Sequence, residues 1–228
     1  MKINHVLIMA AGRGMRMRPL TKKIPKAMAK LNGISLISHN LKKISNNIKN
    51  THITVGYKNS LLASHVMNKN VATILNTSGK GNCWWIYNTL MKNIDECVLV
   101  LTCDNLVDLD FESIWQDYVS ANKPLCMLVP VKPDKNYTGD FLKCDKESRI
   151  LSISRKLKTK YYASGIQLLN PKKINQITKS TDSFYNLWDQ LILKKMLYCS
   201  KIYPKKWCEI NTLVQLRNIE KQMQNKTY

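Results

Sequence analysis

A loop rich in glycine, alanine and arginine follows the first apolar segment of the chain. Residues 9–21 read MAAGRGMRMRPLT. Small residues let backbone amides approach an anion closely, and the arginines add positive charge beside it. The loop therefore predicts a phosphate cradle, with an ordinary turn carrying solvated arginines as the alternative. It is not a Walker loop, because no Gly-Lys-Ser/Thr follows, and Met17 replaces the third glycine of a dinucleotide fingerprint.

An aspartate at the end of an apolar run is the second candidate for chemistry. Residues 98–101 read VLVL and lead through Thr102 and Cys103 to Asp104. If this run is a strand of an open α/β sheet, Asp104 lies in the crevice at the carboxyl ends of the strands, where ligands bind. The alternative is an aspartate that caps the following turn.

Alternating strands and helices have to position these groups. Through residue 131, short apolar runs alternate with segments whose apolar residues recur at helical spacing, which is typical of βαβ units. We expect a Rossmann-like, doubly wound three-layer α/β/α fold with a mostly parallel mixed sheet. The expected strands are residues 3–10, 51–56, 71–75, 97–103, 125–131, 139–144, 150–155 and 162–169. The expected helices are residues 35–48, 59–67, 84–92, 111–120, 183–196, 213–224 and a segment near 174.

The composition is that of one domain with a hydrophobic core. The chain has 228 residues, 44% of them hydrophobic, and no repeat or linker divides it, so we expect a single domain over residues 1–228. It has no run of 18 apolar residues and no signal peptide, so we expect a cytoplasmic protein with no membrane partner. Seven scattered cysteines lack disulfide or metal-site spacing and are expected to be reduced and mostly buried.

The chain is strongly basic. Its 36 Lys and Arg against 15 Asp and Glu give a net charge of +21, and such a field attracts phosphates and nucleic acids. Lysine outnumbers arginine 30 to 6 and is spread over the whole chain, whereas proteins that read bases favour arginine. We therefore expect no specific nucleic-acid partner. A non-catalytic basic nucleic-acid-binding protein stays open as an alternative of another class.

The glycine loop and its continuation resemble the opening signature of the sugar-1-phosphate nucleotidyltransferase family, in its compact bacterial form. The choline-phosphate cytidylyltransferases are a related subgroup. The signature is AAGxGxRxxPLT, followed by PK and a GxPLI-like helix start. The resemblance implies that the loop wraps a nucleoside triphosphate, that Arg16 holds the departing pyrophosphate and that Lys26 neutralises charge at the reacting phosphate. The matching residues are Ala10, Ala11, Gly12, Gly14, Arg16, Pro19, Leu20, Thr21, Pro25, Lys26 and Gly33 with the segment to Ile37.

The same resemblance implies a Mg²⁺ site. Asp104 and Asn105 match the family's GD or GDN motif, whose aspartate binds the catalytic magnesium, although Cys103 replaces the usual glycine. Residues 207–212, WCEINT, resemble its W-x-D-x-G/N-T motif, so Glu209 is implied as the second metal ligand. A surface glutamate before a helix is the alternative for Glu209. Asn105 is assigned to acceptor binding.

The second half of the chain resembles the family's acceptor-binding half less closely. Gly139, Lys156 and Gly165 match, and Lys156 is implied to hold the acceptor phosphate as a point charge. Arg155 stands where the family usually has a glutamate that contacts sugar hydroxyls. This departure puts the usual hexose contact in doubt and permits a different or more acidic acceptor.

Residues 76–85 resemble the family's nucleoside-facing segment only loosely. From them we assign Asn76, Gly81 and Asn82 to nucleotide binding, with a glycine turn as the alternative. The resemblance as a whole implies a nucleotide-binding half at about residues 1–131 and an acceptor-binding half at about residues 132–228.

These features predict a Mg²⁺-dependent enzyme that transfers a nucleoside monophosphate from a nucleoside triphosphate to a sugar-1-phosphate and releases pyrophosphate. Compact members of the family often supply surface polysaccharide or glycolipid synthesis, so the resemblance implies that setting. The expected partners are a nucleoside triphosphate and a phosphomonoester acceptor, and a homo-oligomer stays open. A CTP:phosphocholine-type cytidylyltransferase that acts on a non-sugar phosphomonoester is the alternative within nucleotidyl transfer.

Overall fold

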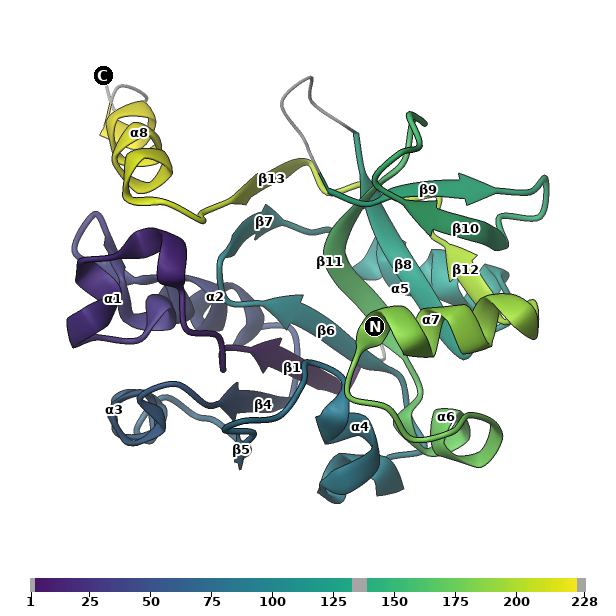
Figure 1. Cartoon of the computed structure of the whole chain (residues 1–228), viewed down its shortest axis with the longest axis horizontal. Coiled ribbons are helices and arrows are strands. Elements are labelled where there is room, and N and C mark those ends of the chain that lie inside the picture. The colour runs from purple at the N-terminus through teal and green to yellow at the C-terminus, as the bar shows by residue number, and fades with distance from the viewer. Residues whose placement is uncertain (1–2, 133–138, 225–228) are drawn as a thin grey trace. The chain divides into compact units, whose positions relative to one another are not determined.

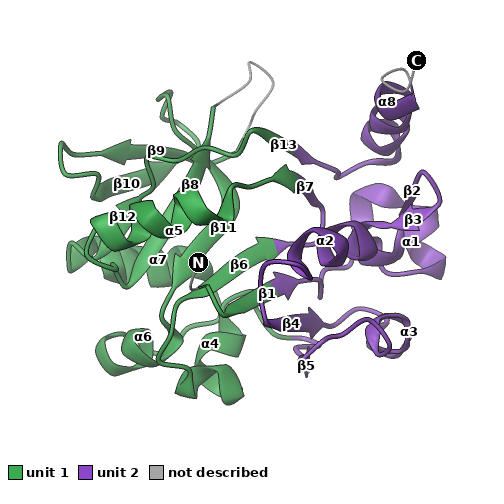
Figure 2. Cartoon of the chain, turned by 180° about the vertical axis from the view of Figure 1, so that it is seen from behind, with its two compact units in different colours: residues 1–7, 80–101, 107–207 green, residues 8–79, 102–106, 208–228 purple. Residues whose placement is uncertain are grey.

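The computed structural model describes residues 3–132 and 139–224 and divides into two compact units. Unit 1 consists of residues 1–7, 80–101 and 107–207, and unit 2 consists of residues 8–79, 102–106 and 208–228 (Figure 2). Strands β1 (His5–Met9) and β6 (Val98–Thr102) contribute residues to both units. The chain therefore passes between the units several times.

Unit 2 holds the glycine loop and the elements that follow it, most of which are labelled in Figure 1. Strands β4 and β5 pair in parallel with His52 opposite Thr73, and β2 and β3 form a short antiparallel pair. The strands are β2 (Lys30–Leu31), β3 (Ile34–Ser35), β4 (Asn50–Val55) and β5 (Thr73–Asn76). The helices are α1 (Leu20–Lys23), α2 (Leu36–Ile44), α3 (Asn59–Val66) and α8 (Leu213–Gln224), with 3₁₀ turns at Met15–Met17 and Lys26–Met28.

A hydrophobic cluster in unit 2 holds the end of the glycine loop. Met17, at the end of the glycine loop, is fully buried and packs in one cluster with residues of β2, α2 and α8. Helix α2 buries the apolar stripe that its sequence predicts, because Leu36, Ile37, Leu41 and Ile44 recur at helical spacing. The buried members of the cluster are Met17, Ala29, Leu31, Leu36, Ile210 and Leu216.

Helix α2 begins at a polar cap that connects it to α3. The Ser35 hydroxyl accepts a hydrogen bond from the Ser38 amide at 3.3 Å and lies 2.9 Å from His65 Nε2. Burial, with a smaller contribution from the charge of Lys69, lowers the pKa of His65 below its usual 6.5. The neutral imidazole is therefore favoured in the folded chain.

This histidine predicts a loss of stability in mild acid. Because the folded-state pKa of His65 lies below the unfolded value of 6.5, the unfolded chain binds more protons near that pH. The free energy of unfolding then falls as the pH drops through and below 6.5. We expect the melting temperature of wild type to fall more between pH 7.5 and 5.5 than that of the His65→Gln variant. Equal pH dependence of the two melting temperatures would contradict the assignment.

Unit 1 contains most of the antiparallel strand pairs. Strand β11 pairs antiparallel with β6, β8 and β9, β10 pairs antiparallel with β9, and β12 pairs in parallel with β8. All six residues of β8 are buried. The strands are β7 (Asn105–Asp108), β8 (Cys126–Val131), β9 (Phe141–Cys144), β10 (Ile150–Ser154), β11 (Tyr162–Leu169), β12 (Leu197–Cys199) and β13 (Lys206–Glu209), of which β7 and β13 run from one unit into the other. The helices are α4 (Trp84–Asn88), α5 (Phe111–Ser120), α6 (Pro171–Ile177) and α7 (Phe184–Leu193), with a 3₁₀ turn at Leu90–Asn93.

The α/β class and the mixed sheet predicted from the sequence are confirmed. Most element bounds differ by one or two residues, and three helices end clearly earlier than expected. The helix expected over residues 84–92 ends at Asn88, the one expected over 183–196 ends at Leu193, and the one expected over 35–48 ends at Ile44.

All seven cysteines are free and five of them are buried, as expected. Within the described residues, no helix is long and apolar enough to span a membrane. The organisation as one domain with halves before and after residue 131 stays a prediction.

Candidate active site

A pocket of about 310 Å³ lies within unit 2, where the glycine loop meets the residues that follow β6. It brings together six of the residues predicted from the sequence, namely Gly12, Gly14, Arg16, Lys26, Asp104 and Glu209. The remaining wall residues, which the sequence analysis did not assign, are Met9, Met15, Thr102, Cys103 and Asn211.

Backbone geometry makes Gly14 necessary. Its φ of 59° lies in the left-handed region, and a Cβ atom there would approach Lys26 Cβ to 2.8 Å. Its carbonyl accepts a hydrogen bond from the Thr21 hydroxyl at 2.9 Å. The glycine loop is thus fastened to the segment that carries Lys26.

The start of the loop is bound to β4 and the turn after it. Ala10, which is buried, donates its amide proton to Thr54 Oγ1 at 3.1 Å, and the Ala11 carbonyl accepts from the Tyr57 amide at 3.0 Å. A Cβ atom on Gly56 would lie 2.7 Å from the Ala11 carbonyl oxygen, so the two segments touch. The predicted nucleotide-binding residues Ala10 and Ala11 therefore fix the loop through their backbone, while Gly12 and Gly14 line the pocket.

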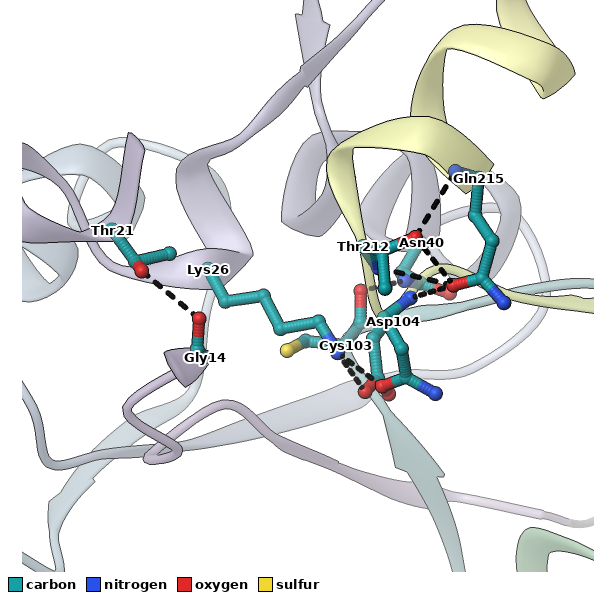
Figure 3. A network of polar contacts seen from close by, with 9 residues as sticks. Gly14, Thr21, Lys26, Asn40, Cys103, Asp104, Thr212 and Gln215 are labelled. Carbon is teal, nitrogen blue, oxygen red and sulfur yellow. Dashed lines mark hydrogen bonds and ion pairs between the residues drawn. The ribbon is translucent and has the colours of Figure 1, made fainter. Parts of the chain in front are cut away.

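Lys26 connects two oxygen atoms in the pocket (Figure 3). Its ammonium nitrogen lies 2.5 Å from Asp104 Oδ2 and 2.8 Å from Asn211 Oδ1. The side chains of Lys26 and Asp104 are 11% and 20% exposed, so water screens this ion pair less than a surface pair. One positive charge therefore lies between a carboxylate and a carboxamide that come from distant parts of the chain.

The backbone around Asp104 is held on both sides. The Cys103 amide donates to the Met9 carbonyl at 3.0 Å, and Asn40 Nδ2, from helix α2, donates to the Cys103 carbonyl at 3.2 Å. The Asp104 carbonyl accepts from the Ile210 amide at 2.9 Å. These three hydrogen bonds fix the carboxylate without using its oxygens.

Cys103 contributes an un-ionised thiol to the wall. Burial, followed by the charge of Asp104, raises the pKa of this thiol far above its usual value, against an opposing effect of Lys26. The thiol stays protonated near neutral pH, so it is not an activated nucleophile.

A capping box at the start of α8 positions Asn211. Gln215 Oε1 accepts hydrogen bonds from the amides of Asn211 at 2.8 Å and Thr212 at 3.0 Å, and the Gln215 amide donates to Thr212 Oγ1 at 3.2 Å (Figure 3). The T-x-x-Q pattern of residues 212–215 is the sequence signal of such a cap. It was the available clue to Asn211, which the sequence analysis missed.

The donor set is compatible with Mg²⁺. Asp104 Oδ2 and Asn211 Oδ1 both lie close to the Lys26 ammonium, and Glu209 lines the same pocket. Mg²⁺ prefers hard oxygen ligands and is usually held by one or two carboxylates together with water and substrate phosphates. Within residues 3–132 and 139–224, no group of three or more His, Cys, Asp or Glu side chains forms an all-protein metal cage. An open site completed by substrate oxygens fits these residues.

Asn105 and Asn76 also belong to unit 2. Asn105 is 3% exposed and begins β7, and it is not part of the pocket wall. Asn76 ends β5, where its Oδ1 accepts from the Ser78 amide at 3.0 Å and from the Ser78 hydroxyl at 2.8 Å. Its side chain thus shapes the turn that follows β5.

Two predicted nucleotide-binding residues, Gly81 and Asn82, lie in unit 1. Asn82 Oδ1 accepts from the Phe184 amide at 3.0 Å, and a Cβ atom on Gly81 would overlap the backbone of Asp182. The segment that contains both residues is therefore packed against the start of α7.

The predicted acceptor-binding residues of the second half also lie in unit 1. Arg155 is 70% exposed and its Nε lies 3.5 Å from Asp140 Oδ1, while the Tyr185 hydroxyl donates to Asp140 Oδ2 at 2.5 Å. Lys156, which is exposed, follows β10. Arg155 therefore belongs to a polar cluster with an acid and a phenol that the sequence analysis did not assign.

The two acceptor-site glycines are explained by backbone geometry. A Cβ atom on Gly139 would overlap the Tyr162 hydroxyl, so the chain passes close to that ring. Gly165 has a φ of 79° and lies where the β11–β8 register shifts between Ala163 and Ile166.

The sequence matches the family described as nucleotidyl transferase over residues 5–226. Among characterised proteins it is similar to the bifunctional protein GlmU of Methanococcus aeolicus, with 24% identity over 152 residues. That alignment covers 67% of this chain and 36% of the relative, so the chain spans less than half the length of this relative.

Two solved structures show the same fold. The inositol-1-phosphate CTP transferase of T. maritima superposes with a TM-score of 0.78 at 17% identity, over 97% of this chain and 95% of that chain. The CTP:phosphocholine cytidylyltransferase LicC of Streptococcus pneumoniae superposes with a TM-score of 0.75 at 18% identity, over 96% of this chain and 98% of that chain. At such identities the likeness establishes the fold alone.

Proposed function

Because the chain belongs to the nucleotidyl transferase family, we propose that it transfers a nucleoside monophosphate from a nucleoside triphosphate to a sugar-1-phosphate and releases pyrophosphate. The observation that carries the proposal is the pocket in which Lys26 joins Asp104 and Asn211 beside the glycine loop. Cationic groups and backbone amides suit a polyphosphate, and the oxygen donors suit its counter-ion.

The reaction needs no protein nucleophile. An oxygen of the acceptor phosphate attacks the α-phosphorus in line, and the bond from that phosphorus to the bridging oxygen of pyrophosphate breaks. The acceptor phosphate is already ionised at neutral pH, so no protein base is required. The chain's task is to position the two phosphates and to compensate their charge.

The residues of unit 2 divide this task between them. Arg16 and the amides of the glycine loop bind the β- and γ-phosphates and stabilise the departing pyrophosphate. The Lys26 ammonium compensates the negative charge that grows at the reacting phosphate.

Asp104 and Glu209 would hold Mg²⁺. Asn211 Oδ1, which lies beside the Lys26 ammonium in the same pocket, would be a third oxygen ligand. A bound Mg²⁺ supplies charge neutralisation at the phosphates and orients their oxygens. Before substrates arrive, Lys26 neutralises the carboxylate of Asp104 through their ion pair.

Residues outside the pocket complete the proposed substrate sites. In unit 1, Lys156 would hold the acceptor phosphate, with Arg155, Gly139 and Gly165 shaping the acceptor site. In unit 2, Asn105 is the residue proposed for acceptor binding. Nucleoside contacts are proposed for Asn76 in unit 2 and for Gly81 and Asn82 in unit 1. Asn82 Oδ1 accepts from the Phe184 amide, so the contact proposed for Asn82 is made by Nδ2. The proposed setting is surface polysaccharide or glycolipid synthesis in the cytoplasm.

A CTP:phosphocholine-type reaction is the second candidate. Its support is the fold shared with LicC over nearly the whole length of both chains, together with Arg155 in the place of a sugar-contacting glutamate. Membership of the family favours either enzyme over a basic nucleic-acid-binding protein.

A panel assay separates the candidates. Pyrophosphate release is measured with Mg²⁺ while ATP, CTP, GTP, UTP and dTTP are each combined with sugar-1-phosphates, inositol-1-phosphate and phosphocholine. We expect one nucleotide paired with a sugar-1-phosphate to react clearly faster than the rest. Turnover with CTP and phosphocholine alone would select the second candidate, and no release with any pair would overturn the proposal.

A further inference from the structure

Thr102 carries a buried hydroxyl group that has no hydrogen-bond partner within residues 3–132 and 139–224. Buried polar groups in native proteins are nearly always paired, because desolvation without a partner costs stability. An unpaired buried hydroxyl therefore calls for an explanation, and a hydrogen bond formed when a ligand binds supplies one.

The position of Thr102 points to the active-site pocket. Thr102 is the last residue of β6, two residues before Asp104, and it forms part of the same pocket wall as Lys26. The backbone that follows is fixed, because the Cys103 amide is bonded to Met9 and the Cys103 carbonyl to Asn40. The hydroxyl itself is buried in the free chain, so contact with a ligand in the pocket requires the side chain to rotate about χ1 to another staggered position.

The chemistry of the neighbouring groups limits what this hydroxyl can bind. Arg16 and Lys26 are cations suited to phosphate, and Asn211 Oδ1 is already bonded to Lys26. A neutral hydroxyl both donates and accepts a hydrogen bond, as does a hydroxyl group of a sugar. The side chains of Met9 and Cys103 in the same wall are weakly polar and suit the carbon face of a sugar ring.

We propose that Thr102 is a specificity-determining residue that hydrogen-bonds a hydroxyl group of a phosphorylated substrate, which is either the ribose of the nucleotide or a ring hydroxyl of the acceptor. The inference rests on the proposed nucleotidyl transfer, and it adds that the pocket selects for a hydroxyl-bearing substrate.

The test compares Thr102→Val with Thr102→Ser. Valine keeps the shape and removes the hydroxyl, whereas serine keeps the hydroxyl. Binding of the five nucleoside triphosphates, of their 2′,3′-dideoxy forms, of glucose-1-phosphate and of phosphocholine is measured by thermal shift and calorimetry, and acceptor KM is measured with the productive nucleotide. We expect Thr102→Val to weaken one hydroxyl-bearing substrate by about 10-fold and Thr102→Ser to stay near wild type. The valine variant should melt at or above the wild-type temperature, since it loses an unpaired buried group.

The two sources of the hydroxyl give different results. If the partner is the ribose, Thr102→Val weakens triphosphate binding and has no effect on the dideoxy form. If the partner is the acceptor, triphosphate binding is unchanged, the KM for the sugar phosphate rises, and phosphocholine binding is unaffected.

Failure of this inference and failure of the proposed function are distinguishable. Wild-type affinity and KM in the valine variant, or an equal loss in the serine variant, would overturn the role of Thr102 alone. Wild-type protein that binds a triphosphate but releases no pyrophosphate with any acceptor would overturn nucleotidyl transfer alone. Absence of wild-type binding to every probe would overturn both.

Discussion

Replacing Asp104 with Asn is expected to lower turnover by about 10²–10³-fold while the chain stays folded. The substitution keeps the size of the side chain and removes the negative charge that faces Lys26 at 2.5 Å. The backbone hydrogen bonds that hold residues 103 and 104 do not involve the carboxylate, so the strand end keeps its geometry. Turnover is measured as pyrophosphate release with the productive pair of substrates, and folding by circular dichroism.

Asp108→Asn is the matched control for this variant. Asp108 lies on β7, four residues further along the chain, and is exposed to solvent. We expect its turnover to stay within about twofold of wild type, because an exposed carboxylate outside the pocket contributes little to charge compensation there. A folded Asp104→Asn protein with turnover near that of the control would remove Asp104 from the proposed mechanism.

The sequence predicted most of the elements but not their interruptions. The helix expected over residues 84–92 is broken at Thr89, whose backbone is extended and whose hydroxyl accepts from the Met91 amide at 3.2 Å. Threonine competes for backbone groups in this way, and apolar periodicity does not register the competition. The unpredicted strands β2, β3 and β12 have two or three residues each, too few for an alternating pattern to stand out.

The site was predictable where a motif is contiguous. The glycine loop and Lys26 lie within 17 residues of one another in the sequence, and the pocket contains both. The T-x-x-Q pattern marks the helix start beside Asn211, but it does not reveal the contact with Lys26 across 185 residues on which the role of Asn211 depends. Thr102 was missed for a different reason. Whether a hydroxyl group has a hydrogen-bond partner depends on residues that are distant in sequence, so it follows from the structure and not from the sequence.

Lys26→Met is expected to reduce kcat by about 10²–10³-fold, with a smaller change in the KM of either substrate. Methionine keeps an unbranched side chain of similar length and removes the charge that would offset the transition state. Lys26→Arg should rescue little, because a planar guanidinium does not replace a compact ammonium that lies 2.5 Å and 2.8 Å from two oxygens in a mostly buried place. The exposed Lys30 on β2, changed to Met, is the matched control and should keep wild-type turnover.

The same variant separates catalysis from structure through a double-mutant cycle. If the Lys26–Asp104 pair stabilises the folded chain, Lys26→Met and Asp104→Asn each lower the free energy of unfolding, and their combination lowers it by less than the sum. We expect a coupling of about 1.5–3 kcal/mol, the range for a hydrogen bond to a charged group. A coupling of this size with turnover unchanged in Lys26→Met would make Lys26 a structural residue. Coupling of this size together with loss of turnover is the expected result, because the ammonium pairs with Asp104 in the free chain and compensates charge at the reacting phosphate during transfer.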